Sequence, residues 1–130
     1  MTPPNRPSQH ALADTFRALH ADPAGFLIPN PWDAGTARLL AHLGFRALAS
    51  TSAGFSFGRG HADRSVPRGP LLAHLVELTA ATALPVSADL ENGFGDAPST
   101  VAETIRLAAA AGVVGGSIED ATGRADAPLY

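Results

Sequence analysis

Acidic residues cluster at two points of this sequence, each at the end of a short apolar segment. Asp89 and Glu91 close one segment, and Glu119 and Asp120 close the next. If these segments are parallel strands, their carboxyl ends meet at one edge, where α/β folds build their sites. Neighbouring strands lie about 4.8 Å apart, so Asp89 and Glu119 are expected to share one rim.

Carboxylates crowded on one rim repel one another, and a divalent cation relieves that repulsion. Ligands that are all oxygen favour Mg²⁺ or Mn²⁺ over zinc. The chain has no Cys, and its five His residues show no ligand-like grouping. A single acid at a strand end is as often a helix cap or a loop-ordering residue. Four acids at two adjacent strand ends favour a functional site, so we predict Mg²⁺, with Mn²⁺ possible.

Small residues follow two of the predicted strands. Gly93 and Gly95 permit a tight turn whose N–H groups can face an anion, although a plain turn uses the same glycines. Small residues at 51–54 let backbone amides approach a carboxylate or phosphate, and a simple turn explains them equally well. Asn30 and Trp32 are candidates to line the pocket, although packing is the commoner role of a Trp.

Apolar spacing and turn residues predict the elements that position these groups. Helices are expected at 8–20, 34–43, 70–82 and 100–111, and strands at 26–28, 46–50, 85–89 and 114–118. Strand and helix alternate, which indicates a parallel α/β sheet. A flavodoxin-like or Rossmann sheet is the competing architecture, and no G-x-G-x-x-G motif supports its dinucleotide-binding form. The stretch 51–67 is expected to be a long functional loop.

Individual residues mark where these helices start and stop. Ser8 and Asp33 are expected to cap the first two helices, and Thr100 has capping-box spacing to Glu103 for the last. Gly44 and Gly112 are each placed to end a helix.

Composition limits the class of protein. The chain has 130 residues, 45% apolar and 16% charged, which indicates one globular domain at 8–130 after a flexible arm at 1–7. A complete (β/α)₈ barrel typically needs about 250 residues.

A net charge of −3 without a basic stripe argues against nucleic acid, and no apolar run reaches the ~18 residues of a membrane span. Without Cys the chain fits a reducing cytoplasm, and without Lys it has no Schiff-base nucleophile.

Four motifs in order carry a more specific signal: NPWDAG at 30–35, TSAG at 51–54, SADLENGFG at 87–95 and GSIED at 116–120. Together they resemble the isocitrate lyase/phosphoenolpyruvate mutase superfamily over about residues 8–130. The resemblance implies an α/β fold comprising the first four βα units of a (β/α)₈ TIM barrel, a half-barrel. It also implies binding of Mg²⁺ and a small 2-oxo or hydroxy carboxylate, with C–C or P–C bonds cleaved or formed through an enolate.

Carried over position by position, the resemblance implies roles for individual residues. Asp89, Glu91 and Glu119 are implied as metal ligands, with Glu91 replacing the second Asp of a D-x-D pattern and Glu119 holding a water ligand. Catalytic roles are implied for Asp63, Glu91 and Glu119, and Asp63 matches a mobile-loop acid once a one-residue gap is allowed. The substrate-binding residues are expected to be Asn30, Trp32, Thr51, Ser52, Ala53 and Gly54, with the amides of Ser52 and Ala53 gripping the carboxylate.

Departures from the family pattern narrow the expected reaction. The lyases carry a Lys-Cys-Gly-His type loop, and this chain has neither Lys nor Cys. Isocitrate and methylisocitrate cleavage are therefore disfavoured, and phosphonopyruvate, oxaloacetate or a similar oxo acid is expected. We expect a cytoplasmic, homo-oligomeric lyase or isomerase without nucleic-acid or membrane partners. The alternatives are a truncated non-catalytic fragment, a small-molecule or metal-binding module, or a flavodoxin-like domain with an acidic Mg²⁺ pocket.

Overall fold

The computed structural model describes residues 6–124 and 126–130. At its centre lies a three-stranded parallel sheet in the order β1-β2-β3, formed by Leu48–Ala49, Val86–Asp89 and Gly115–Ser117. Parallel neighbours need crossover connections, and helices supply them here. All three strands therefore end at the same edge, as the alternating sequence pattern predicts.

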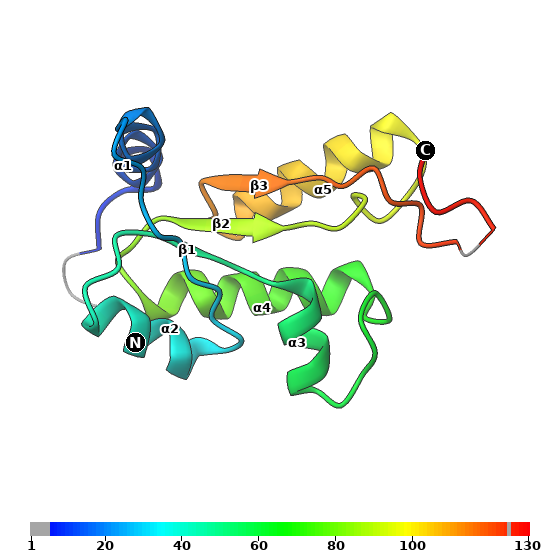
Figure 1. The fold of residues 1–130 in the computed structure, drawn as a ribbon, viewed down its shortest axis with the longest axis horizontal. Coiled ribbons are helices and arrows are strands. Elements are labelled where there is room, and N and C mark those ends of the chain that lie inside the picture. The colour runs from blue at the N-terminus through cyan, green and yellow to red at the C-terminus, as the bar shows by residue number, and fades with distance from the viewer. Residues whose placement is uncertain (1–5, 125) are drawn as a thin grey trace.

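Five helices surround the sheet: α1 Gln9–Ala21, α2 Ala34–His42, α3 Ser52–Gly58, α4 Arg68–Ala81 and α5 Pro98–Ala110. In Figure 1, α4 runs along one face of the sheet and α5 lies behind β3. Helix α2 packs on the outer side of α4, and α1 stands at the end where the strands begin. The short α3 lies at the opposite end, where β1 finishes. The carboxyl edge of the sheet is thus bordered by α3 and by the turns after β2 and β3.

Apolar burial fixes this edge in place. The main core joins α3, α4, β2, α5 and the segment that leads into β3, through Phe55, Val66, Leu71, Leu75, Val86, Ala88, Leu90, Ala108 and Val113. A second cluster, formed by Ala37, Leu48 and Leu78, seats α2 and β1 on the other side of α4. Each fully buried aliphatic side chain contributes about 1.5–3 kcal/mol. The turns that carry the acids therefore rest on well-packed strands.

Most of the predicted helix ends are confirmed. Ser8 accepts a hydrogen bond from the Ala11 N–H at 3.2 Å, and Asp33 forms a reciprocal capping box with Thr36. Gly44 and Gly112 end their helices with φ of +89° and +93°, a conformation that glycine adopts without strain.

The first predicted strand, 26–28, is wrong. No strand forms there, and one backbone hydrogen bond, from the Ala49 N–H to the Pro29 carbonyl at 3.1 Å, joins the residue just after this segment to β1. Pro29 and Pro31 have no N–H, so a ladder cannot continue along this segment. The sheet consequently has three strands among the described residues, where the sequence predicts four.

The predicted loop 51–67 contains a helix. Thr51 caps α3 by accepting the Gly54 N–H on its side-chain oxygen at 3.1 Å, and Phe55 anchors the helix in the core. The glycines at 54 and 58 concealed this helix because glycine disfavours helix interiors.

The capping box predicted at Thr100 is also wrong. Helix α5 starts two residues earlier, at Pro98, and has no side-chain cap. Proline is favoured in a first turn because its missing N–H needs no partner there. Glu103 instead forms an ion pair with Arg106 at 2.6 Å.

Two further expectations concern the N-terminal arm and membrane-spanning segments. Of the arm predicted at 1–7, the first five residues lie outside the described residues. In the described part of the chain, no helix is both long and apolar enough to cross a membrane.

Candidate functional site

Asp89 is held at the end of β2 by donors from the chain on both sides. The N–H and the hydroxyl of Ser52 both donate to Asp89 Oδ2, at 2.9 and 2.8 Å, and the Glu91 N–H donates to Oδ1 at 3.1 Å. The Asp89 N–H in turn donates to the Ser50 hydroxyl at 2.9 Å. These bonds fix the direction of the Asp89 carboxylate.

Asp89 and Glu119 line one cavity of about 300 Å³, as the strand ends predict. Its wall is mostly small polar residues and backbone, and it includes Asn30 and Thr51. The Asn30 side-chain amide donates to the Ala49 carbonyl at 3.0 Å, which ties the segment before α2 to β1. Four segments that are far apart in the sequence therefore meet at this cavity.

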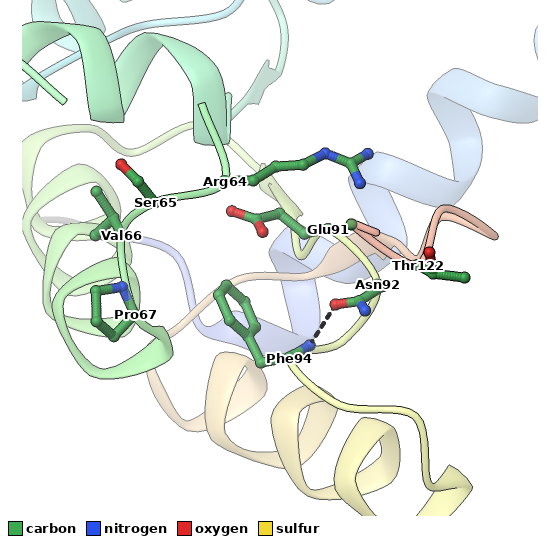
Figure 2. Close-up of a pocket in the computed structure, with 9 residues that line it drawn as sticks. Arg64, Ser65, Val66, Pro67, Glu91, Asn92, Phe94 and Thr122 are labelled. Atoms are coloured by element: carbon green, nitrogen blue, oxygen red, sulfur yellow. Dashed lines mark hydrogen bonds between the residues drawn. The ribbon is translucent and has the colours of Figure 1, made fainter. Parts of the chain in front are cut away.

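Glu91 lies beside this cavity and faces a neighbouring one, also about 300 Å³, shared with Arg64, Phe94 and Thr122 (Figure 2). It is buried, with 8% of its surface exposed, and its φ of +51° is unusual for a side-chain-bearing residue. Burial raises the pKa of Glu91 to about 7. The charges of nearby carboxylates contribute to this rise in the pKa, and the Arg64 guanidinium opposes it.

Glu119 and Asp63 complete the acidic group. Glu119 forms an ion pair with Arg64, and its N–H donates to the Glu91 carbonyl at 2.7 Å. Asp63 is exposed in the segment between α3 and α4, and its charge is among those that raise the pKa of Glu91. The three predicted catalytic acids therefore lie within electrostatic reach of one another.

Other predicted substrate residues lie elsewhere or already have partners. Trp32 is half-exposed and lines a separate cavity of about 290 Å³ with Phe55 and His74. A Cβ on Gly54 would lie 2.5 Å from the Trp32 ring, so the glycine is needed for that contact. The Ser52 N–H binds Asp89, and Ala53 follows it in α3.

Sequence reasoning missed Arg64 and Ser50. Arg64 is separated from Glu119 by 55 positions, and the sequence offers no pattern that pairs them. Ser50, a small hydroxyl residue at the end of β1 beside TSAG, could have been included on the same grounds as its neighbours.

The donor chemistry fits a hard cation, but the carboxylates do not form a closed cage. Within the described part of the chain, no three His, Asp or Glu side chains are gathered closely enough to hold a metal ion together. Mg²⁺ usually keeps several waters and binds through one or two carboxylates. Asp89 and Glu119, on one oxygen-rich cavity, meet that requirement.

A parallel α/β fold with acids at the carboxyl ends of its strands is typical of α/β enzymes, which build their sites at those ends. The sequence pattern of the phosphoenolpyruvate phosphomutase family matches residues 16–130 of this chain. The chain therefore belongs to the phosphoenolpyruvate mutase/isocitrate lyase superfamily, as the motifs predict.

Individual relatives agree with this membership. A crystal structure of a Burkholderia cenocepacia J2315 protein, provisionally described as a lyase/mutase, is 68% identical with a TM-score of 0.92, over 94% of this chain and 44% of that one. The 2-methylisocitrate lyase of Halalkalibacterium halodurans is 35% identical over 87% of this chain and 38% of its own length. The oxaloacetate decarboxylase of Chromohalobacter salexigens is 32% identical over 88% and 40%. The chain spans about two fifths of these relatives.

Proposed function

We propose that this chain carries the cation- and carboxylate-binding rim of a Mg²⁺-dependent lyase or phosphonomutase-like isomerase. Its substrate class is a small 2-oxo or hydroxy carboxylate, and the reaction cleaves or forms a C–C or P–C bond through an enolate. The observation that carries the proposal is that Asp89 and Glu119 line one cavity at the carboxyl ends of β2 and β3. Two relatives named for small carboxylates, 2-methylisocitrate and oxaloacetate, support the substrate class.

Asp89 and Glu119 would hold the cation, with Mn²⁺ as an alternative to Mg²⁺. When bound, the cation would supply positive charge to the oxygen on which an enolate's negative charge develops. Ser52 orients Asp89 with two hydrogen bonds, so its proposed role shifts from gripping the substrate to positioning a ligand. The Ala53 amide remains the proposed donor to the substrate carboxylate, and Asn30 and Thr51 shape the cavity wall.

Proton transfer is proposed for the acids around this cavity. Glu91 has a pKa of about 7, which suits a group that both accepts and donates a proton near neutral pH. Asp63, on the segment between α3 and α4, is the proposed acid that approaches the reacting centre from above the rim. Trp32 and Gly54 keep a supporting role, because their mutual contact fixes the start of α3.

A binding module without turnover is the second candidate. The observation that favours it is the lack of a three-residue cluster of possible metal ligands among the residues described. Such a module would bind Mg²⁺ and a small carboxylate and leave the carboxylate unchanged. Turnover, measured together with binding of Mg²⁺ and oxalate, separates the two candidates.

The larger assembly is also a proposal. We propose that the three parallel strands belong to a (β/α)₈ barrel whose first half corresponds to this chain, in a cytoplasmic homo-oligomer. Exposed apolar side chains at the β3 edge and on α5, Ile118 and Ile105, support further packing on that side. The lack of Cys fits a reducing compartment.

Turnover of a panel of oxo and hydroxy acids, with and without Mg²⁺, tests the proposed reaction. Oxaloacetate and phosphonopyruvate are the first compounds to try, followed by 2-methylisocitrate, whose cleavage the lack of Lys and Cys disfavours. We expect Mg²⁺-dependent loss of one of these compounds, abolished in Asp89→Ala and kept in Asp14→Ala, which removes an exposed acid from α1. Full activity in Asp89→Ala would show that the assigned ligand is wrong, and binding of Mg²⁺ and oxalate without turnover would favour the binding module.

A further inference from the structure

Arg64 bridges two segments of the rim. It lies between α3 and α4, and its guanidinium forms an ion pair with Glu119, just past the end of β3. In Figure 2 the Arg64 side chain extends alongside the Glu91 carboxylate, at the mouth of their shared cavity. The guanidinium thus lies against one proposed cation ligand and beside a buried acid.

The backbone around Arg64 is built to hold this position. Arg64 has a φ of +61°, a left-handed conformation that is uncommon for residues other than glycine. Ser65 donates from both its N–H and its hydroxyl to the Ala62 carbonyl, at 3.3 and 2.5 Å, which closes a tight turn around Arg64. Val66, immediately after the turn, is buried in the main core. The turn therefore aims an otherwise long and flexible side chain at the acids.

Charge explains what this placement achieves. The Arg64 guanidinium pairs with Glu119 and lines one cavity with Glu91, so one positive charge faces two carboxylates. A guanidinium so placed offsets the mutual repulsion of the carboxylates when no cation is bound. A divalent cation at Glu119 would meet the same oxygen atoms and would be repelled by the guanidinium. Arg64 and the cation must then compete for Glu119.

We propose that Arg64 is the internal counter-ion of the acidic rim, the group formed by Asp63, Asp89, Glu91 and Glu119. The divalent cation displaces Arg64 from Glu119, and the guanidinium is then available to bind a second anionic group of the substrate. The second step rests on the proposed function above. A released guanidinium offers a planar pair of donors that matches a carboxylate or phosphonate. Arg64 would thereby favour acids that carry another carboxylate or a phosphonate over acids that lack one.

The proposal predicts opposite effects on two ligands in one variant. Arg64→Gln removes the competitor, so Mg²⁺ alone binds about three- to tenfold more tightly, since a partly exposed ion pair is weak. With Mg²⁺ saturating, the same variant binds malate about tenfold more weakly or worse, because a charged hydrogen bond is lost. Lactate, a hydroxy acid without the second carboxylate, binds wild type and variant equally. Loss of structure would weaken all three ligands together.

Calorimetric titration of wild type, Arg64→Gln and Arg64→Lys with Mg²⁺ alone, then with malate and lactate, is the test. Arg64→Lys keeps the charge and should stay near wild type for Mg²⁺, which separates charge from fold. Hydrogen exchange of the amides at 61–66 should speed up when Mg²⁺ is added to wild type and be fast already in Arg64→Gln. Unchanged or weaker Mg²⁺ binding in Arg64→Gln overturns the counter-ion role, and equal loss of malate and lactate overturns the anion-binding role. If wild type itself binds no Mg²⁺, the proposed function falls together with this inference.

Discussion

Replacing Glu91 by Gln removes a buried negative charge while keeping the shape of the side chain. The pKa of Glu91 rises from 4.5 to about 7 on folding, chiefly because the residue is buried and then because other carboxylates surround it. Each pKa unit corresponds to about 1.4 kcal/mol, so ionised Glu91 destabilises the fold by about 3 kcal/mol. Without a cation, Glu91→Gln should therefore be more stable than wild type above pH 7, by up to that amount.

The sign of the pH dependence follows from proton binding. Between pH 4.5 and about 7 the folded state holds a proton on Glu91 that the unfolded state has lost. The contribution of Glu91 to stability should fall as pH rises through this window, and the difference in stability between Glu91→Gln and wild type should grow over the same range. Below pH 4.5 Glu91 is protonated in both the folded and the unfolded state. The two proteins should then differ in stability only by the local effect of replacing a carboxyl group with an amide.

Urea unfolding of both proteins across this pH range, in a chelating buffer, measures the difference. Asp14→Asn, which removes an exposed carboxylate from α1, is the matched control and should leave the pH profile close to that of wild type. Excess Mg²⁺ should narrow the gap between wild type and Glu91→Gln, because a nearby cation favours the ionised carboxylate. A gap that is constant with pH, or a destabilised Glu91→Gln above pH 7, would refute the electrostatic reasoning.

Three further substitutions test separate parts of the structure. His74 is buried against the Phe55 ring at 4.1 Å with Nε2 unpartnered, and burial lowers its pKa below 6.5. The contribution of His74 to stability should thus fall as pH drops below 6.5, opposite in sign to that of Glu91. His74→Phe should be more stable by about 1 kcal/mol and should lack this loss in acid, as thermal melts at several pH values will show. Asp33→Ala removes the N-cap of α2 and should lower the free energy of unfolding in urea by about 1 kcal/mol. An unchanged unfolding midpoint would show that the cap does not contribute to stability. Ser52→Ala removes one of three donors to the Asp89 carboxylate and should weaken Mg²⁺ binding, measured by calorimetry, about tenfold. Equal affinity would mean that the two backbone donors suffice.

The placement of the acids was accessible from the sequence because it depends on topology alone. Strand–helix alternation makes the strands parallel, and parallel strands bring their carboxyl ends to one edge. Asp89 and Glu119 therefore meet at one cavity whatever the detailed packing. Helix caps at Ser8 and Asp33 were predictable for a similar reason, since a cap depends on a few consecutive residues.

Features that depend on residues far apart in the sequence, or on the absence of a backbone N–H, could not be predicted from the sequence. The segment at 26–28 is apolar enough for a strand, but the prolines after it cannot donate to a ladder. Helix α3 forms although it contains Gly54, because burial of Phe55 and contact with Trp32 outweigh the weak helix propensity of glycine. Ser52, which binds Asp89, and Arg64, which pairs with Glu119, come from other segments, and no spacing in the sequence indicates these pairings.

The central claim is that a divalent cation binds at the cavity shared by Asp89 and Glu119, and Mn²⁺ can locate it directly. Paramagnetic Mn²⁺, added in small amounts to isotope-labelled chain, broadens the backbone resonances nearest to it. The account predicts selective loss of the amide signals at 50–53, 89–91 and 117–119, with α1 unaffected and with the signals retained in Asp89→Asn. Broadening centred on any other part of the chain, or identical broadening in Asp89→Asn, would contradict it.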